Sequence, residues 1–372
     1  MATLKGVTLT LLMGPVAVAP PPVAVIEALE SAQVTTAVGQ RSGFQIVFTY
    51  SKTSPIATTL LPAGFFDPLI RVILVATLNG VPKVLSDGPI KRQDVVVSPH
   101  PGENKLTITG EDVSGYMDLI DFTGFPFPAM PRFARVALMM AKYAMFGVIP
   151  APIPSPFDMT DSPTEKYAHQ QGTDFQYADK LAKDVGYEFY LTPGPAPGTN
   201  TAYWGPQIRV GVPQPALTID MDHASNIESL SFSADGNAAE MPYGFVKVAG
   251  FSIPVPVPDI GLLKPPLSAR PLIPKKTKLI DTERMKLPDV LTALLAGRGG
   301  VDPVSATGSI DVTRYGQPID ARALVGVRGA GLAHDGVYYV RSVTNTLGRG
   351  TWKQTFQLAR DGLVSNLPSV PT

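Results

Sequence analysis

The stretch Arg71–Gly88 reads RVILVATLNGVPKVLSDG and gives the clearest local signal in a sequence of 372 residues. Two apolar runs flank the dipeptide Asn79-Gly80. Both positions of a two-residue hairpin turn need positive φ, which asparagine and glycine adopt most readily. The stretch therefore predicts a β-hairpin and indicates a β-rich fold.

The segment upstream of the hairpin, GFQIVFTYS (43–51), alternates along its length. Phe44, Ile46 and Phe48 fall on one face, which we expect to be buried because it is the more apolar face. The opposite face is then expected to line a channel or a subunit seam.

The N-terminal segment also alternates and predicts a strand through Val7, Leu9 and Leu11. A signal peptide is the alternative, but prolines interrupt the apolar stretch. No window offers the roughly 18 uninterrupted apolar residues that a membrane span needs. We therefore expect a strand here and no membrane span.

Residues 123–212 differ in character and predict an α/β region. A helix is expected over 131–146, because Pro131 is tolerated at a helix start and Gly147 suits the position just after a helix end.

The stretch TDFQYADKLAKDVGYEFYLT (173–192) predicts a second helix that leads directly into a strand. Thr173 and Gln176 have the Thr-x-x-Gln spacing of a capping box. We interpret Asp174 as a first-turn carboxylate favoured by the helix dipole rather than as a catalytic group. Gly186 can end the helix in a left-handed conformation.

The remainder of the chain returns to short strands, among them ESLSFSA, GSIDVTR and GVYYVRSVTNT. The expected fold is mainly β with α+β insertions, and short strands at this spacing suggest a barrel or a sandwich. The expected domains are residues 1–122, 123–212 and 213–372. An insertion rich in proline and lysine is expected at 251–306, with a short helix at 288–296.

The composition excludes several functional classes. Lys+Arg and Asp+Glu both total 31, so a net charge of zero gives no general attraction to nucleic acid or anionic membrane. The absence of cysteine excludes disulfides and thiolate chemistry. Zero net charge also provides little colloidal repulsion, which favours membership of an assembly.

No catalytic, cofactor or metal site is expected from the sequence. The four histidines, His100, His169, His223 and His334, show no ligand spacing. Asp220 and Asp222 would share one strand face, but a solvated strand end explains them, as an exposed turn explains Glu111-Asp112. The candidate interface residues are Tyr203, Trp204, Lys275 and Lys276, for which loop packing and a solvated charge run are the alternatives.

Several segments, in consistent order, resemble the baseplate hub proteins of contractile phage tails and related injection systems, the late-control-D family. The resemblance covers about residues 4 to 365. The segments that carry it are TITGEDVSGYMDLIDF (107–122), ARVALMMAKYAMFGVIPAP (134–152), QQGTDFQYADKLAKDVGYEFYL (170–191), AYWGPQIRVGVPQPALTIDM (202–221), NIESLSF (226–232) and VRGAGLAHDGVYYVRSVTNTLGRGTWKQTFQLARDG (327–362).

The resemblance implies a non-enzymatic structural protein with two tube-like β-barrel domains flanking an α/β region. It implies a homotrimeric ring that joins a six-fold inner tube, or a tube-initiator protein, to a three-fold central spike, with further baseplate components around it. Because the sequence stops seven residues after Ser365, the spike is expected to be a separate chain. Assembly is expected in the bacterial cytoplasm, within a virion or an injection particle that can be released.

Two functions from other classes remain as alternatives. One is a glycan- or envelope-binding module that uses Tyr203 and Trp204. The other is a peptidoglycan hydrolase that uses Asp220 and Asp222.

Overall fold

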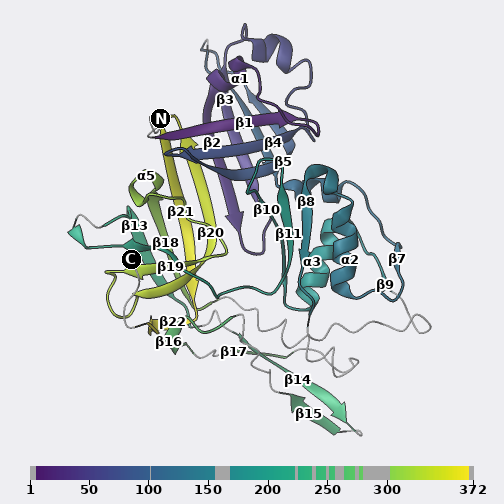
Figure 1. Cartoon of the computed structure of the whole chain (residues 1–372), viewed down its shortest axis with the longest axis vertical. Helices are drawn as coiled ribbons and strands as arrows, with labels where there is room; N and C mark the ends of the chain where they lie inside the picture. The colour runs from purple at the N-terminus through teal and green to yellow at the C-terminus, as the bar shows by residue number, and fades with distance from the viewer. Residues whose placement is uncertain are drawn as a thin grey trace.

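A computed structural model describes residues 6–100, 102–155, 168–222, 225–236, 240–248, 251–255, 264–272, 276–279 and 302–367. This part of the chain is mainly β and contains several sheets, with a smaller helical portion beside them (Figure 1). No helix within it is long and apolar enough to cross a membrane.

The elements before residue 120 are nearly all strands. They are β1 (Val7–Gly14), α1 (Val23–Ala28), β2 (Leu29–Ala37), β3 (Gly43–Tyr50), the π-helical turn η1 (Ile56–Leu60), β4 (Arg71–Leu78), β5 (Val81–Val96), β6 (Asn104–Glu111) and the 3-10 helix η2 (Val113–Asp118). The α/β region contains β7 (Pro126–Phe127), α2 (Arg132–Ala141), the 3-10 turn η3 (Ala144–Phe146), β8 (Val148–Pro152), β9 (Ala168–His169), α3 (Asp174–Asp184), β10 (Glu188–Pro193) and β11 (Asn200–Gly205). The last region contains β12 (Gln214–Thr218), β13 (Ser229–Ala234), β14 (Glu240–Val248), β15 (Phe251–Val255), β16 (Ser268–Pro271), β17 (Lys276–Leu279), β18 (Val304–Asp311), α5 (Val312–Tyr315), β19 (Leu324–Arg328), β20 (Gly336–Gly348), β21 (Thr351–Arg360) and β22 (Gly362–Ser365).

One large sheet connects the two β regions. Its path runs β1-β4-β5-β6-β3-β2-β20-β21-β18-β13, and β19 and β12 branch from β20. The connection is the antiparallel pairing of 32–37 in β2 with 342–347 in β20, visible in Figure 1 where early and late strands lie side by side. Among the described strands no pairing closes this sheet, so the expected two closed barrels are not seen as separate units.

The hairpin predicted at Asn79-Gly80 is confirmed. β4 and β5 pair antiparallel down to Leu78 opposite Val81, and the two turn residues have φ of 49° and 87°. The bulge between Leu74 and Val75 shifts the register of this ladder.

The buried face of β3 is also as predicted. Phe44, Ile46 and Phe48 are at most 4% exposed, whereas Gln45 between them is exposed. They belong to a first core cluster that also takes in Val312, Leu347 and Trp352 from the last region. The first β region therefore completes its core with residues from the far end of the chain.

A second core cluster lies in the α/β region and a third in the last β region. In the α/β region, α2 is shorter than the predicted 131–146 helix. It ends at Ala141, and Tyr143 leaves helical geometry with φ −96° and ψ 13° before the separate turn η3. Gly147 ends the turn at φ 73° as predicted, and a Cβ there would lie 1.9 Å from the Gly198 carbonyl oxygen.

The helix–strand unit at 173–192 is confirmed. Thr173 Oγ1 accepts from the Gln176 N–H, and the Gln176 side chain accepts from the Thr173 N–H. After Gly186, which has φ 70°, β10 pairs antiparallel with β11, and β11 pairs parallel with β8. This small sheet carries α2 and α3 on one side (Figure 1).

One strand prediction in the last region is wrong in part. GSIDVTR was expected to be strand throughout, but β18 ends at Asp311 and α5 follows. Asp311 accepts the Thr313 N–H and so caps this helical turn. Of the expected insertion 251–306, the described parts include β15, β16 and β17, and the predicted helix at 288–296 lies outside the described residues.

Candidate functional site

The described residues contain no group of three His, Asp or Glu side chains that could hold a metal ion. The Asp220 and Asp222 prediction is wrong in its geometry, because β12 ends at Thr218 and both aspartates lie beyond it in left-handed turn conformations at φ 50° and 48°. Both are exposed, as expected for carboxylates at a solvated strand end. His223 lies outside the described residues.

Asp112 is buried and therefore differs from the exposed turn residue that was expected. It is 4% exposed and accepts the backbone N–H groups of Ser42 and Ser114. Burial raises the pKa of Asp112 above its ordinary value, although these hydrogen bonds oppose the rise. Its role is to cap η2 and fix the loop before β3 against it.

The candidate interface residues have different environments. Trp204 is fully buried, and its Nε1 donates to the Ala178 carbonyl oxygen in α3, so its indole is a core group and not a surface anchor. Tyr203 is partly buried and stacks on Tyr190, with 4.9 Å between ring centroids. Lys275 lies outside the described residues, and Lys276 opens β17.

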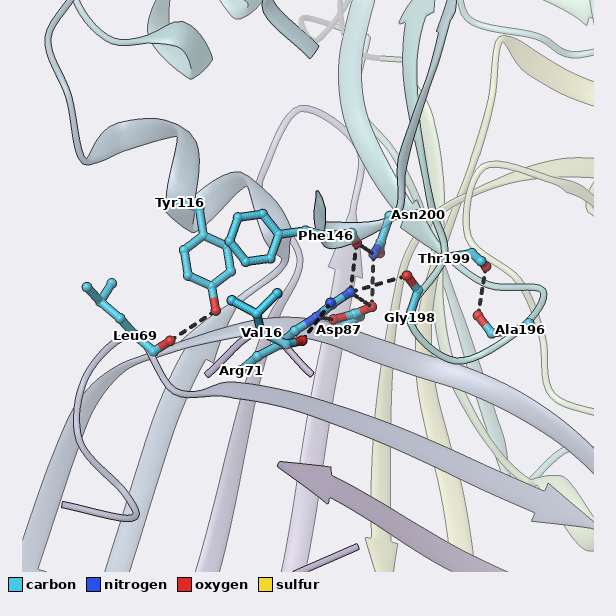
Figure 2. A network of polar contacts seen from close by, with 10 residues as sticks. All are labelled: Val16, Leu69, Arg71, Asp87, Tyr116, Phe146, Ala196, Gly198, Thr199 and Asn200. Carbon is cyan, nitrogen blue, oxygen red and sulfur yellow. Dashed lines mark hydrogen bonds and ion pairs between the residues drawn. The ribbon is translucent and has the colours of Figure 1, made fainter. Parts of the chain in front are cut away.

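The structure shows three sets of polar contacts between the regions, which we call joints. The first joins β4 and β5 to the α/β region (Figure 2). Arg71 and Asp87 form a two-pronged ion pair, with Nε to Oδ1 at 2.6 Å and Nη2 to Oδ2 at 2.7 Å. Both side chains are almost fully buried, and Asp87 also accepts from Asn200 Nδ2 at 2.8 Å. Arg71 Nη2 in turn donates to the carbonyl oxygens of Phe146 and Gly198.

An aromatic contact flanks this joint. Tyr116 of η2 stacks on Phe146, with ring centroids 4.2 Å apart and nearly parallel planes. Burial raises the pKa of Tyr116 to about 12, so the phenol keeps its proton and donates it to the Leu69 carbonyl oxygen (Figure 2). The ion pair and the stack together fix the end of η3 against β4 and β5.

The second joint lies between the loop after β2 and the start of α3. Arg41 pairs with Glu111 and with Asp118, and its guanidinium lies 3.6 Å from the ring centroid of Phe175. Thr173, the N-cap of α3, donates to Asp118 Oδ1 at 2.6 Å. The capping residue of the helix is thereby tied to the first β region.

This second joint predicts a loss of stability in acid. Burial alone would raise the pKa values of Glu111 and Asp118, but hydrogen bonds from Lys91, Arg41 and Thr173 outweigh it and lower both, from ordinary values of 4.5 and 3.8. A carboxylate with a lowered pKa stabilises the fold fully above its ordinary pKa and loses this effect as the pH falls through the lowered value. We expect stability to decline below about pH 4.5 for this reason, and to decline less in Arg41→Leu.

The measurement is the urea midpoint of wild type and Arg41→Leu at intervals between about pH 7 and about pH 3. Lys183→Leu is the control, because Lys183 forms an exposed ion pair with Asp179 elsewhere in the α/β region. Parallel profiles for wild type and Arg41→Leu would contradict the expectation.

The third joint brings all three regions together. Arg322, which has φ 63°, lies 3.9 Å over the ring of Tyr190 in β10 and donates from Nη2 to the Ala37 carbonyl oxygen of β2. Nearby, Arg209 and Asp302 form a second buried ion pair, 3% and 9% exposed, that links the segment after β11 to the start of β18.

Asp174 has a larger role than the expected first-turn carboxylate. It is fully buried and accepts from Lys142 Nζ, Tyr143 Oη and Gln170 Nε2, all within 3.0 Å. Lys142 and Tyr143, which follow α2 directly, both contact the start of α3 through this carboxylate. From the sequence, Asp174 could be predicted only as a residue of the first helical turn, and its three partners could not be predicted.

A tail protein from Neisseria meningitidis matches 97% of this chain over 98% of its own length, with a TM-score of 0.62 and 15% identity. The 43 kDa tail protein of prophage MuSo2 from Shewanella oneidensis matches 96% of this chain over 100% of its own length, with a TM-score of 0.61 and 12% identity. The fold is similar to that of phage tail proteins.

The likeness extends to secretion systems. A component of the E. coli type VI secretion system, itself similar to the T4 tail proteins gp27 and gp5, matches 92% of this chain over 77% of its own length, with a TM-score of 0.51 and 10% identity. No protein-family model and no curated protein matches the sequence. Because the sequence identities are only 10–15%, these comparisons show a similar fold and nothing further.

Proposed function

We propose that this chain is a structural subunit of a phage tail or a related contractile particle, and specifically its baseplate hub. The observation that carries the proposal is the match in both directions: almost the whole chain corresponds to almost the whole of two tail proteins, one of them from a prophage. A fold shared over nearly the whole of both chains supports a shared structural role, which fold alone does not establish.

In this proposal three copies form a ring, and the two β regions of each copy supply six tube-like units around a channel. The ring joins a six-fold inner tube to a three-fold spike carried by another chain. Assembly occurs in the bacterial cytoplasm. The late-control-D type of hub is the form that the motif order favours, and the likeness to a type VI secretion component supports the same position in a particle.

The three joints support a part that transmits force. Two of them use buried charges: Asn200 of the α/β region donates to the buried Arg71–Asp87 pair in the first joint, and Arg209 pairs with Asp302 in the third. The second joint uses the partly buried Arg41. Buried ion pairs hold one geometry because breaking them leaves an uncompensated charge. A ring that must survive contraction needs such rigid connections between its parts.

The test is electron cryo-microscopy of the particle together with native mass spectrometry of this chain mixed with its spike. We expect three copies per spike and density for the chain at the junction of tube and spike. A chain that stays monomeric with the spike and is absent from that junction would overturn the hub proposal. Finding it elsewhere in the tail would retain the tail role and reject the hub.

We also propose that the chain is not an enzyme. The exposed turn position of Asp220 and Asp222 offers no buried acid, and Trp204 is unavailable for glycan stacking because it is buried. Cleared zones in a peptidoglycan zymogram that disappear in Asp220→Asn would overturn this part of the proposal.

A further inference from the structure

A cavity of about 270 Å³ lies where the three regions meet. Its walls come from β2, β5, β10, β20, β21 and the loop before β19, and the polar residues that line it are Thr36, Lys83, Thr192, Asp320, Arg322, Asn345 and Gln354. The cavity lies at the third joint, because Tyr190 and Arg322 also line it. The hub proposal does not require this cavity.

The orientation of Asn345 is fixed by its neighbours. Its Oδ1 accepts from Trp352 Nε1 at 2.9 Å and from Gln354 Nε2 at 2.8 Å. Gln354 is itself held by Ile319, whose N–H donates to Gln354 Oε1 and whose carbonyl oxygen accepts from Gln354 Nε2. If the amide were flipped, Nδ2 would face these two N–H donors and could accept from neither. The oxygen therefore faces Trp352 and Gln354, and Nδ2 points away from them.

The Asn345 amide thus presents donors without an acceptor. The residue is 6% exposed and lines the cavity, and Nδ2 donates to no atom of the described residues. Nδ2 is not one of the fully enclosed atoms that lack a partner, so it is open to the cavity, and an acceptor there can pair with it. Such a group in a cavity wall points to an acceptor that enters from outside the chain.

Positive charge lines the same cavity. Arg322 forms no ion pair with any described residue, its Nε is buried without an acceptor, and stacking on Tyr190 holds the guanidinium in place. The one lining carboxylate, Asp320, pairs with Lys83, and its side chain is 60% exposed. Glu188 also lies near Arg322 but does not line the cavity. The lining therefore combines a net positive charge with free donors.

We propose that this cavity binds a small oxyanion of the phosphate or carboxylate class. Arg322 supplies the charge, Asn345 Nδ2 supplies an oriented donor, and the hydroxyls of Thr36 and Thr192 can donate from the wall. A ligand bound there contacts all three regions at once, so it stabilises their relative arrangement.

The test uses the full chain and two probes, inorganic phosphate and acetate, each titrated against sodium chloride at equal ionic strength. We expect a saturable rise of the thermal midpoint with at least one probe, and the probe that saturates at lower concentration identifies the class. No saturable rise with either probe would overturn the proposal.

Asn345→Asp is the decisive variant. It keeps the oxygen that accepts from Trp352 and Gln354 but replaces the free donor by a carboxylate oxygen, so we expect the anion to bind roughly tenfold or more weakly. Gln45→Glu is the matched control, because it adds the same charge at an exposed position on β3, and we expect it to bind as wild type does. An unchanged response in Asn345→Asp would overturn the proposal.

Asp320→Asn guards against the case in which Asn345→Asp fails to fold. This change removes the only lining carboxylate and frees Lys83, so we expect tighter binding, by roughly two- to tenfold. Loss of stability cannot produce a gain in affinity. Weaker binding in Asp320→Asn would therefore contradict the proposed charge arrangement.

Discussion

Asp87→Asn is expected to lower the free energy of unfolding by about 3–5 kcal/mol. The change leaves the guanidinium of Arg71, which is 4% exposed, without its counter-ion. It also places an amide where Arg71 and Asn200 both donate, so at least one buried donor loses its acceptor. The measurement is urea unfolding followed by circular dichroism, with the slope of the transition compared between proteins.

Asp179→Asn is the matched control for this result. Asp179 pairs with Lys183 one helical turn away on the exposed face of α3, where the lysine side chain is 71% exposed. The same chemical change there should cost no more than about 0.5 kcal/mol, as is usual for exposed helical pairs. Equal effects of the two substitutions would show that the first joint does not stabilise the fold.

A double variant separates the contribution of the Arg71–Asp87 ion pair from that of the carbonyl oxygens around it. Arg71→Met combined with Asp87→Leu removes both charges, and we expect it to be less destabilising than Asp87→Asn alone. The carbonyl oxygens of Phe146 and Gly198 then lose a donor, so full recovery is not expected. A double variant less stable than Asp87→Asn would show that these carbonyl contacts dominate the joint.

Phe44→Asp is expected to prevent stable folding of the first β region, with a loss of at least about 4 kcal/mol. The ring is 4% exposed and packs directly over Gly110 of β6, where a Cβ would lie 2.2 Å from Phe44 Cζ. An aspartate at this position buries a charge that has no partner and leaves the volume of the ring empty. The measurement is soluble yield, thermal midpoint and copy number with the spike.

Gln45→Asp tests the same substitution one residue along the strand. Gln45 is exposed on the opposite face of β3, so its replacement should change the free energy of unfolding by less than about 0.5 kcal/mol. If both variants folded equally well, the assignment of the buried face would be wrong. If Gln45→Asp folded but failed to assemble, the exposed face would be identified as a seam between subunits.

Local features of the fold could be predicted from the sequence because short-range physics determines them. The turn at Asn79-Gly80 needs positive φ at both residues, which few other dipeptides allow. The capping box of Thr173 and Gln176 satisfies backbone donors within one helical turn. Alternation in β3 has a period of two residues, and therefore it reports which face is buried.

The joints could not be predicted in this way, because their partners are distant in sequence. Arg71 and Asn200 are 129 positions apart and share Asp87. Nothing near Trp204 distinguishes an anchor from a core residue, since its burial depends on α3 covering the sheet. The free amide nitrogen of Asn345 follows from side chains on two strands and a loop that are distant in sequence, so local patterns do not predict it.

The pairing of β2 with β20 has a consequence for synthesis. The edge of β2 that β20 covers emerges about 300 residues before its partner, which at roughly 5–20 residues per second is a delay of about 15–60 s. Over this time the nascent chain carries an open strand edge and a core that lacks Leu347 and Trp352. The first β region is therefore translated first but completes its sheet and core last. A ribosome that stalls before β20 leaves a nascent chain whose open β2 edge can pair with other chains.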